Sequence, residues 1–257
     1  MESMMTMEFL PTLPYIAVEG IKGVGKSTVL SMLKKRLQML PHVSINPTSR
    51  VSRFSWMEFW DQHLPLRRFD CWTRALYANR SNGQVYQAQE QVDALFEEGV
   101  CPQFILGDRS ILTSITTRWH QGKENPEEYY NTIRKEERLI PIPQHVLYMH
   151  ASMDTIFSRI SARNRSYGAF DEQPKRLMAA HETYMKLKDG VLRPLKNIKW
   201  HMISAESNPD QVCEDLYKAI VSILSDKKTK NKKSTLTALS SVLVPTHESL
   251  FMEPKKI

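Results

Sequence analysis

An apolar run followed by a glycine-rich turn constrains this chain more than any other feature. Residues 15–18 read Tyr-Ile-Ala-Val and predict a buried strand, and residues 20–28 match every fixed position of the pattern G-x-x-x-x-G-K-[ST]. From residue 29 onward the apolar positions recur with a helical period. A strand, a glycine-rich loop and a helix in this order predict a phosphate-binding loop, because backbone amides at the positive end of the helix dipole attract phosphate oxygens.

This loop predicts a nucleotide site. We expect Lys26 to reach the β and γ phosphates and the Ser27 hydroxyl to bind Mg²⁺. An ordinary glycine-rich turn before a helix is the alternative, and the flanking strand and helix argue against it. The candidate nucleotide-binding residues are Gly20, Ile21, Lys22, Gly23, Val24, Gly25, Lys26, Ser27 and Thr28.

Composition places the chain among globular proteins. Its 257 residues are 41% hydrophobic, which is enough for a packed core in one large α/β domain or two small ones. Three widely spaced cysteines favour a reducing compartment over a disulfide framework or a zinc site. The N-terminal segment lacks the pattern of a secretory signal, and no apolar stretch approaches the roughly 18 residues of a membrane span. We therefore expect a cytoplasmic protein without a membrane partner.

The net charge of +7 is unevenly distributed. Residues 226–257 hold seven lysines against three acidic residues, a balance of +4 that leaves +3 for residues 1–225. A mildly basic body suits phosphate ligands better than a nucleic-acid footprint, which needs a concentrated basic stripe. The lysine cluster at residues 227–233 is interpreted as part of a solvated, flexible tail, with a nuclear address or a contact for anionic surfaces as alternatives.

Strand-like and helix-like segments alternate along the rest of the chain. This alternation predicts a three-layer α/β fold with a central parallel sheet and helices on both faces. We divide the chain into an N-terminal extension (1–13), a main domain (14–225) and a basic flexible tail (226–257). Further strands are expected at 42–45, 104–106, 146–149 and 200–203, and helices at 27–40, 155–162, 175–188 and 209–224, with helical material up to residue 95.

A second site signal follows the strand expected at residues 104–106. The sequence continues with Gly107-Asp108-Arg109, so an acid and a guanidinium follow this strand at the carboxyl edge of the sheet. The phosphate loop ends the first strand at the same edge, where ligands bind in parallel sheets. We expect Asp108 to approach the Mg²⁺ shell and Arg109 to face the transferred phosphate, with a salt-bridged strand end as the alternative.

The order of these motifs resembles the thymidylate kinase family. It runs from the phosphate loop to Ala-Leu-Tyr-Ala-Asn-Arg at residues 75–80, then to Gly-Asp-Arg, and then to an arginine-bearing segment after a later strand. The resemblance spans residues 15–224 and extends to the wider group of nucleoside and nucleotide kinases. It implies a P-loop kinase fold with an arginine-bearing lid, ATP and Mg²⁺ as cofactors, and a homodimer. By this resemblance Arg80 contacts the acceptor base, Arg109 holds the acceptor phosphate, and Gln121 reads the base.

Residues 158–172 resemble the lid of that family. A lid arginine neutralises the charge that develops on the β and γ phosphates during transfer. Thymidylate kinases place this arginine either in the phosphate loop or on the lid, and the loop position here is Gly23. Arg163 and Arg165 are therefore the catalytic candidates, and a solvated helix end is the alternative.

Two acids that the resemblance implies are missing. The third loop residue is usually acidic in thymidylate kinases and is Lys22 here, and the second strand ends in Asn46-Pro47 in place of Glu-Pro. A deoxynucleoside kinase uses that glutamate to deprotonate a neutral hydroxyl, whereas a monophosphate already offers an anionic oxygen and needs no base. On this ground we expect a monophosphate acceptor.

The leading hypothesis is therefore a magnesium-dependent nucleoside monophosphate kinase, with dTMP as the preferred acceptor. A deoxynucleoside kinase is the alternative within enzymes. A nucleotide-binding relic with little turnover is a second class of hypothesis, and nucleic-acid binding through the lysine cluster ranks last. Aromatic residues at 56–72 favour core packing over an acceptor-stacking surface.

Overall fold

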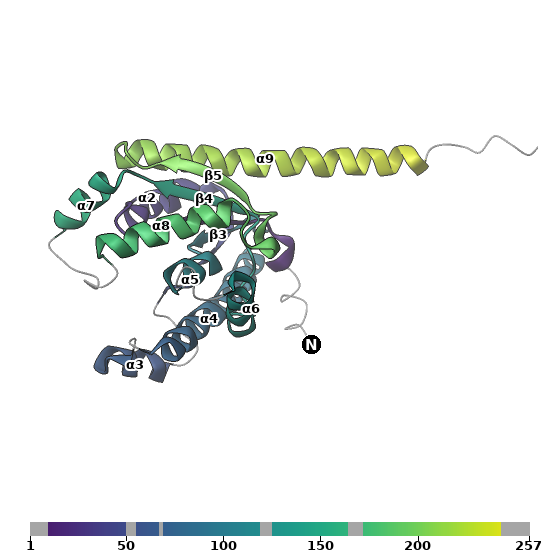
Figure 1. The fold of residues 1–257 in the computed structure, drawn as a ribbon. Coiled ribbons are helices and arrows are strands. Elements are labelled where there is room, and N and C mark those ends of the chain that lie inside the picture. The colour runs from purple at the N-terminus through teal and green to yellow at the C-terminus, as the bar shows by residue number, and fades with distance from the viewer. Residues whose placement is uncertain (1–9, 50–54, 67–68, 119–124, 164–171, 243–257) are drawn as a thin grey trace, which may run out of the picture. The chain divides into compact units, whose positions relative to one another are not determined.

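The computed structural model describes residues 10–49, 55–66, 69–118, 125–163 and 172–242 (Figure 1). The chain divides into two compact units, Met1–Ala219 and Ile220–Ile257. All five strands and the residues of the candidate site lie in the first unit. The first unit therefore contains the architecture that matters for function.

A five-stranded parallel sheet forms the centre of the first unit. Its order is β2-β3-β1-β4-β5, and the strands are β1 (Tyr15–Glu19), β2 (His42–Ile45), β3 (Phe104–Asp108), β4 (His145–His150) and β5 (Lys199–Ser204). β1 lies in the middle and is buried along its whole length, as expected for a strand covered on both faces. In the register Val18 is opposite Asp108 and Ile45 is opposite Gly107, so the ends of β1, β2 and β3 meet at one edge. The predicted three-layer α/β fold is confirmed.

Helices cover both faces of this sheet (Figure 1). α2 (Lys26–Arg36) and the start of α9 (Pro209–Val242) lie side by side, joined by an ion pair between Arg36 and Glu214. A second group packs together through contacts among its own members: α4 (Asp70–Glu97), α5 (Ile111–Arg118), α6 (Pro126–Glu136) and α8 (Pro174–Lys188). α7 (Met153–Ser161) is capped at its N-terminus by Ser152, whose hydroxyl accepts a hydrogen bond from the Thr155 amide at 3.2 Å. The described 3₁₀ turns are η1 (Leu10–Thr12), η2 (Leu37–Met39) and η4 (Arg193–Leu195).

The segment predicted to be a flexible tail begins inside a helix. α9 continues through Val242, so residues 226–242 are helical rather than irregular. Lysine, leucine and alanine favour helices, and the absence of glycine and proline from this stretch lets the helix continue. Within the described residues no helix has the length and apolar character needed to cross a membrane.

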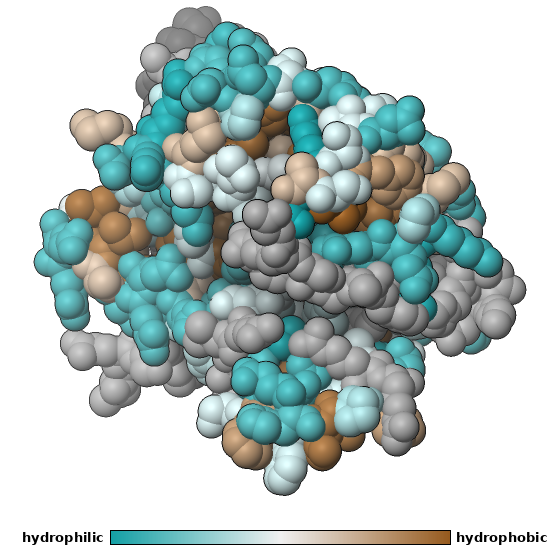
Figure 2. Space-filling view, turned by 90° about the vertical axis from the view of Figure 1, so that its left-hand side faces the viewer, coloured by the Kyte–Doolittle hydropathy of each residue, from teal (hydrophilic) through white to brown (hydrophobic). Residues whose placement is uncertain are grey.

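The aromatic segment does not form core. α3 (Ser55–His63) buries only Met57 and Glu58, while Trp56, Phe59 and Trp60 are 54%, 52% and 45% exposed. Hydrophobic residues gather at the lower edge of Figure 2, at the height where α3 lies in Figure 1. The prediction of core packing is wrong, because this short helix packs through its one buried side and leaves its rings at the surface.

Candidate functional site

The phosphate-binding loop connects β1 to α2 with glycines in conformations that other residues rarely adopt. Gly23 has a φ of +92°. A Cβ atom at this position would lie 2.8 Å from the Ile156 side chain and 2.9 Å from that of Ile160, both on α7. Because α7 fills the space above Gly23, a side chain as large as arginine does not fit in this part of the loop. An arginine at this position would therefore clash with α7 as it is packed here.

Lys26 is the buried cation of the loop. Its ammonium donates hydrogen bonds to the carbonyl oxygens of Gly20 and of Ile21, the latter at 3.1 Å. Burial lowers the pKa of Lys26 well below its usual range, and the neighbouring charges of Arg109 and Arg163 lower it further, against the opposing effect of Glu19 and Asp108. Several cations thus converge on one point, which is the electrostatic setting for a polyphosphate.

Two residues near Lys26 carry oxygen donors suited to Mg²⁺, one next to it in sequence and one whose charge acts on it. Ser27 is exposed at the start of α2, and Asp108 is half-buried at the end of β3. No group of three or more potential metal-binding side chains occurs among the described residues. Mg²⁺ commonly binds through one or two protein oxygens together with water and substrate phosphates, so Ser27 and Asp108 fit this ion.

Asn46 and Asp108 meet at the ends of neighbouring strands. The Asn46 Nδ2 atom donates to Asp108 Oδ2 at 3.2 Å. The orientation of the Asn46 amide is fixed, because its Oδ1 atom accepts hydrogen bonds from the Thr48 amide at 3.1 Å and from the Thr48 hydroxyl at 2.9 Å. A carboxylate therefore lies directly beside the position at which the resemblance implies a glutamate.

Arg109 is held by an unusual backbone conformation and a buried network. It is the one non-glycine residue with positive φ, +80°, among those described, and its carbonyl accepts a hydrogen bond from the Tyr15 hydroxyl at 3.1 Å. Its guanidinium donates to Thr113 Oγ1 at 3.4 Å. Burial alone would lower the pKa of Arg109, but Tyr184, Glu19 and Asp108 raise it overall, so the side chain remains cationic.

Glu19 is the centre of that network and was not among the residues predicted from the sequence. Its carboxylate is fully buried and accepts hydrogen bonds from the Ser110 amide and hydroxyl, both at 2.7 Å, from Thr113 Oγ1 at 2.9 Å and from the Tyr184 hydroxyl at 2.7 Å. Burial and the charge of Glu19 raise the pKa of Tyr184 well above its usual range, which keeps the phenol as a donor. The signal in the sequence was an acid that ends an otherwise apolar strand.

The described part of the lid region contributes two arginines. Arg159 on α7 donates from Nη1 to the Val24 carbonyl of the phosphate loop at 3.2 Å. Arg163 follows four residues later, and its charge lowers the pKa of Lys26. Arg165 lies outside the described residues. Arg159 was also missed among the sequence-based candidates, although it lies in the same arginine-bearing segment.

Lys22 pairs with a carboxylate from another element. Its ammonium lies 3.2 Å from Glu172 Oε1, which lies two residues before α8 begins, and the two side chains are 21% and 10% exposed. The loop cation is thus held by an acid at the end of the lid-like segment.

A cavity of about 560 Å³ opens beside the loop. Its lining comes from the phosphate loop, the ends of β2 and β3, and helices α4, α5 and α8. Four of the lining residues are cationic, and no lining residue among those described is acidic. The cationic and phenolic residues of the lining are Lys22, Tyr77, Arg109, Lys175, Arg176 and Tyr184.

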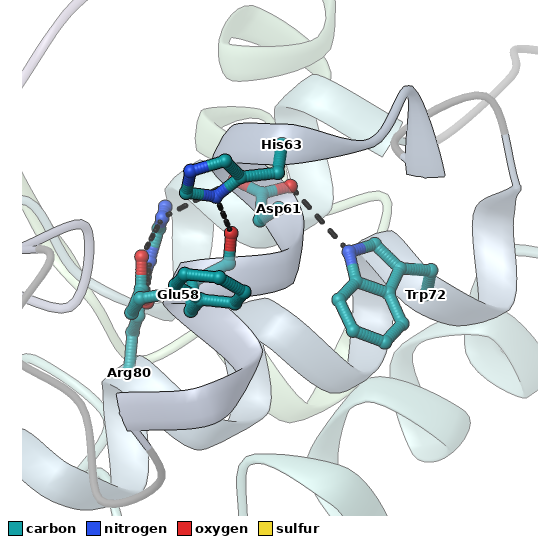
Figure 3. A network of polar contacts seen from close by, with 6 residues as sticks. Glu58, Asp61, His63, Trp72 and Arg80 are labelled. Carbon is teal, nitrogen blue, oxygen red and sulfur yellow. Dashed lines mark hydrogen bonds and ion pairs between the residues drawn. The ribbon is translucent and has the colours of Figure 1, made fainter.

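Arg80 lies outside the lining of this cavity. It is buried on α4 and forms a bidentate pair with Glu58 of α3, from Nε and from Nη2, both at 2.7 Å (Figure 3). Asp61 lies 3.8 Å from the same guanidinium and accepts a hydrogen bond from Trp72 Nε1 at 3.4 Å. Arg80 is not among the residues that line the cavity, so its contact with the acceptor base stays a prediction. Gln121 lies outside the described residues.

The comparison with family models decides the family. Residues 16–225 match the model named deoxynucleoside kinase. The chain belongs to the deoxynucleoside kinase family. Members of this family are ATP-dependent phosphotransferases, and the candidate site has the loop, the buried lysine and the arginines that such a reaction needs.

The resemblance to thymidylate kinases is one of fold. The structure of thymidylate kinase from Candida albicans is similar, with a TM-score of 0.56, 19% identity, and coverage of 82% of this chain and 92% of that one. No curated protein sequence matches the chain. The family match favours the alternative function, phosphorylation of a deoxynucleoside, over the monophosphate kinase that led the sequence-based hypotheses.

Proposed function

We propose that this deoxynucleoside kinase family member transfers the γ-phosphoryl group of ATP to the primary hydroxyl of a deoxynucleoside. The observation that carries this choice is the contact between Asn46 and Asp108. The sequence argument against a nucleoside acceptor was that Asn46 leaves the site without a base. The Asp108 carboxylate lies 3.2 Å from that amide, so the site retains a group that can take the proton.

The described residues divide the reaction between them. Asp108 takes the proton of the acceptor hydroxyl as its oxygen attacks the γ phosphorus, and the bond from that phosphorus to the bridging oxygen of ADP breaks. Lys26 and Arg163 neutralise charge on the transferred group and on the leaving phosphates, and Arg109 aligns the acceptor oxygen with the γ phosphorus. Glu19 acts through Arg109, because it holds Ser110 and Thr113, which follow Arg109 in the chain. No covalent enzyme intermediate is needed.

Ser27 and Asp108 are the described residues that fit Mg²⁺, which would supply further neutralisation of the phosphates when bound. In the proposal Ser27 is the ligand and Asp108 is the base. The earlier assignment of Asp108 to the metal shell is the competing role for the same carboxylate.

A coupled assay with ATP tests the proposal. The four natural deoxynucleosides and their 5′-monophosphates are supplied in turn, and ADP formation is measured. We expect turnover of at least one deoxynucleoside. Turnover of monophosphates alone would contradict the proposal and restore the earlier hypothesis.

A monophosphate acceptor, with dTMP first in the panel, is the second candidate function. The observation that favours it is the cavity lining, in which four cations and no described acid face the acceptor. Such a wall suits an acceptor that already carries phosphate. The same assay separates the two candidates, because each acceptor is present with and without its phosphate.

Other expectations stay predictions. Homodimer formation, predicted from the resemblance, is measurable by light scattering. The relic hypothesis predicts ATP binding without transfer to any acceptor of the panel. Nucleic-acid binding through residues 227–233 predicts a salt-sensitive interaction that is lost when the chain ends at Ser225.

A further inference from the structure

The ion pair between Lys22 and Glu172 lies at the edge of the acceptor cavity. Lys22 lines the cavity, and Glu172, from the segment before α8, contacts the Lys22 ammonium. Both side chains are largely shielded from water, at 21% and 10% exposure, so the pair is screened less than a surface pair. The pair therefore controls how much of the Lys22 charge is offered to a ligand in the cavity.

The charged residues that line the cavity beside Lys22, among those that the structure describes, are all cationic. Arg109, Lys175 and Arg176 line the same cavity, and Glu172 is the acid that the structure places on Lys22. The phosphate group of a phosphorylated acceptor would lie beside the cationic residues that line the cavity. It would compete with Glu172 for the Lys22 ammonium. A neutral acceptor would leave the pair intact.

We propose that Lys22 determines acceptor specificity, because its ammonium is shared between Glu172 and an anionic group on the acceptor. The inference rests on the proposed phosphotransfer in this cavity and adds the residue that separates neutral from phosphorylated acceptors. Glu172 is the internal competitor, and it weakens the preference for an anionic acceptor that Lys22 would otherwise give.

Two single substitutions have opposite expected effects. Lys22→Met removes the cation, and we expect the dissociation constant of a 5′-monophosphate to rise about fivefold to tenfold, as for the loss of one partly screened ion pair. Glu172→Gln removes the competitor, and we expect the same constant to fall about threefold. The dissociation constant of the matching deoxynucleoside should change less than twofold in both variants.

Calorimetric titration without ATP measures these constants for the four natural deoxynucleosides and their 5′-monophosphates. Lys22→Arg keeps the charge and should bind monophosphates like the unmodified protein. Lys35→Met, an exposed change on α2, is the matched control for loss of one lysine and should alter neither series. Thermal unfolding of each variant identifies any that fails to fold. If Lys22→Met fails to fold, a comparison of Lys22→Arg with Glu172→Gln still tests the direction in which the dissociation constant of the monophosphate changes.

A purely structural role of the Lys22–Glu172 pair, which would connect the loop to the segment before α8, predicts a different result. If the pair only holds these elements together, both substitutions weaken both kinds of acceptor, and that result would overturn the proposal. Failure of the unmodified protein to bind any monophosphate would overturn it as well. If the unmodified protein binds monophosphates but phosphorylates no deoxynucleoside, the proposed function fails, while the binding data still decide the role of Lys22.

Discussion

The two sides of the phosphate loop are built in different ways. The nucleotide side consists of consecutive residues, from Gly20 to Thr28, that one strand and one helix hold in place. The acceptor side takes its residues from the loop, two strand ends and three helices, and it includes a pair, Lys22 and Glu172, separated by 150 positions in sequence. In the proposed function, phosphate recognition is thus local, whereas acceptor recognition depends on the tertiary structure.

A short sequence motif can therefore specify phosphate recognition, whereas acceptor recognition needs residues that the fold brings together. The local side uses backbone amides and one lysine, which recognise any triphosphate in the same way. The acceptor side combines four cations with the Asn46 and Asp108 pair, and these residues can change while the loop motif stays intact. Specificity can therefore differ between relatives that share the loop.

The largest expected effect is on the local side. Lys26→Met should lower kcat roughly 10³-fold for every acceptor, because one preorganised cation at the transferred phosphate is lost. Lys34→Met, an exposed change on α2, is the control and should leave kcat unaltered. Steady-state kinetics with the best acceptor measure both variants. A loss confined to one acceptor would contradict the division between the two sides.

The buried pair on α3 and α4 tests whether Arg80 belongs to the acceptor side. Arg80→Met should destabilise the fold by about 3 kcal/mol, because the buried Glu58 carboxylate loses its partner. Urea unfolding measures the effect. Arg74→Met is the control, since its pairs with Asp70 and Glu136 are more exposed and should cost under about 1 kcal/mol. Unchanged stability with lost acceptor affinity would instead assign Arg80 to the substrate.

The sequence predicted the fold around the phosphate loop well, for a physical reason. A buried strand, glycines with special backbone angles and a following helix leave regular patterns, and the loop, the sheet and most helix positions follow from them. The acid Glu19 was missed, because its partners Ser110 and Tyr184 lie 91 and 165 positions away. The exposed position of Trp56 and Phe59 was missed as well, because their spacing shows an apolar side of a helix but not whether another element covers it.

Asp108 has a candidate role on each side of the site, as the base for the acceptor or as a ligand of Mg²⁺. Asp108→Asn should lower kcat for a deoxynucleoside about 10²-fold, because the proton acceptor is lost. Asn46→Glu in the same chain should recover much of that loss if Asp108 acts as the base, since it returns a carboxylate to the neighbouring strand end. The assay uses a Mg²⁺ titration and a pH series. Recovery through added Mg²⁺ alone, without any effect of Asn46→Glu, would assign Asp108 to the metal.

The smallest expected effect is the loss of stability when Gly23 of the phosphate loop is replaced. Gly23→Ala should destabilise the fold by about 2 kcal/mol, because φ is +92° and the new Cβ meets Ile156 and Ile160 of α7 at under 3 Å. Gly99→Ala is the matched control: its φ is +73°, but no atom lies within 4 Å of its Cβ, so it should cost only about 1 kcal/mol of backbone strain. Urea unfolding gives both values. Equal costs would mean that α7 does not restrict the loop and that sterics do not explain the missing loop arginine. A larger cost at Gly23 would show that the packing of α7 helps to assign the catalytic cation to the lid, so that even the local side of the site depends in part on the fold.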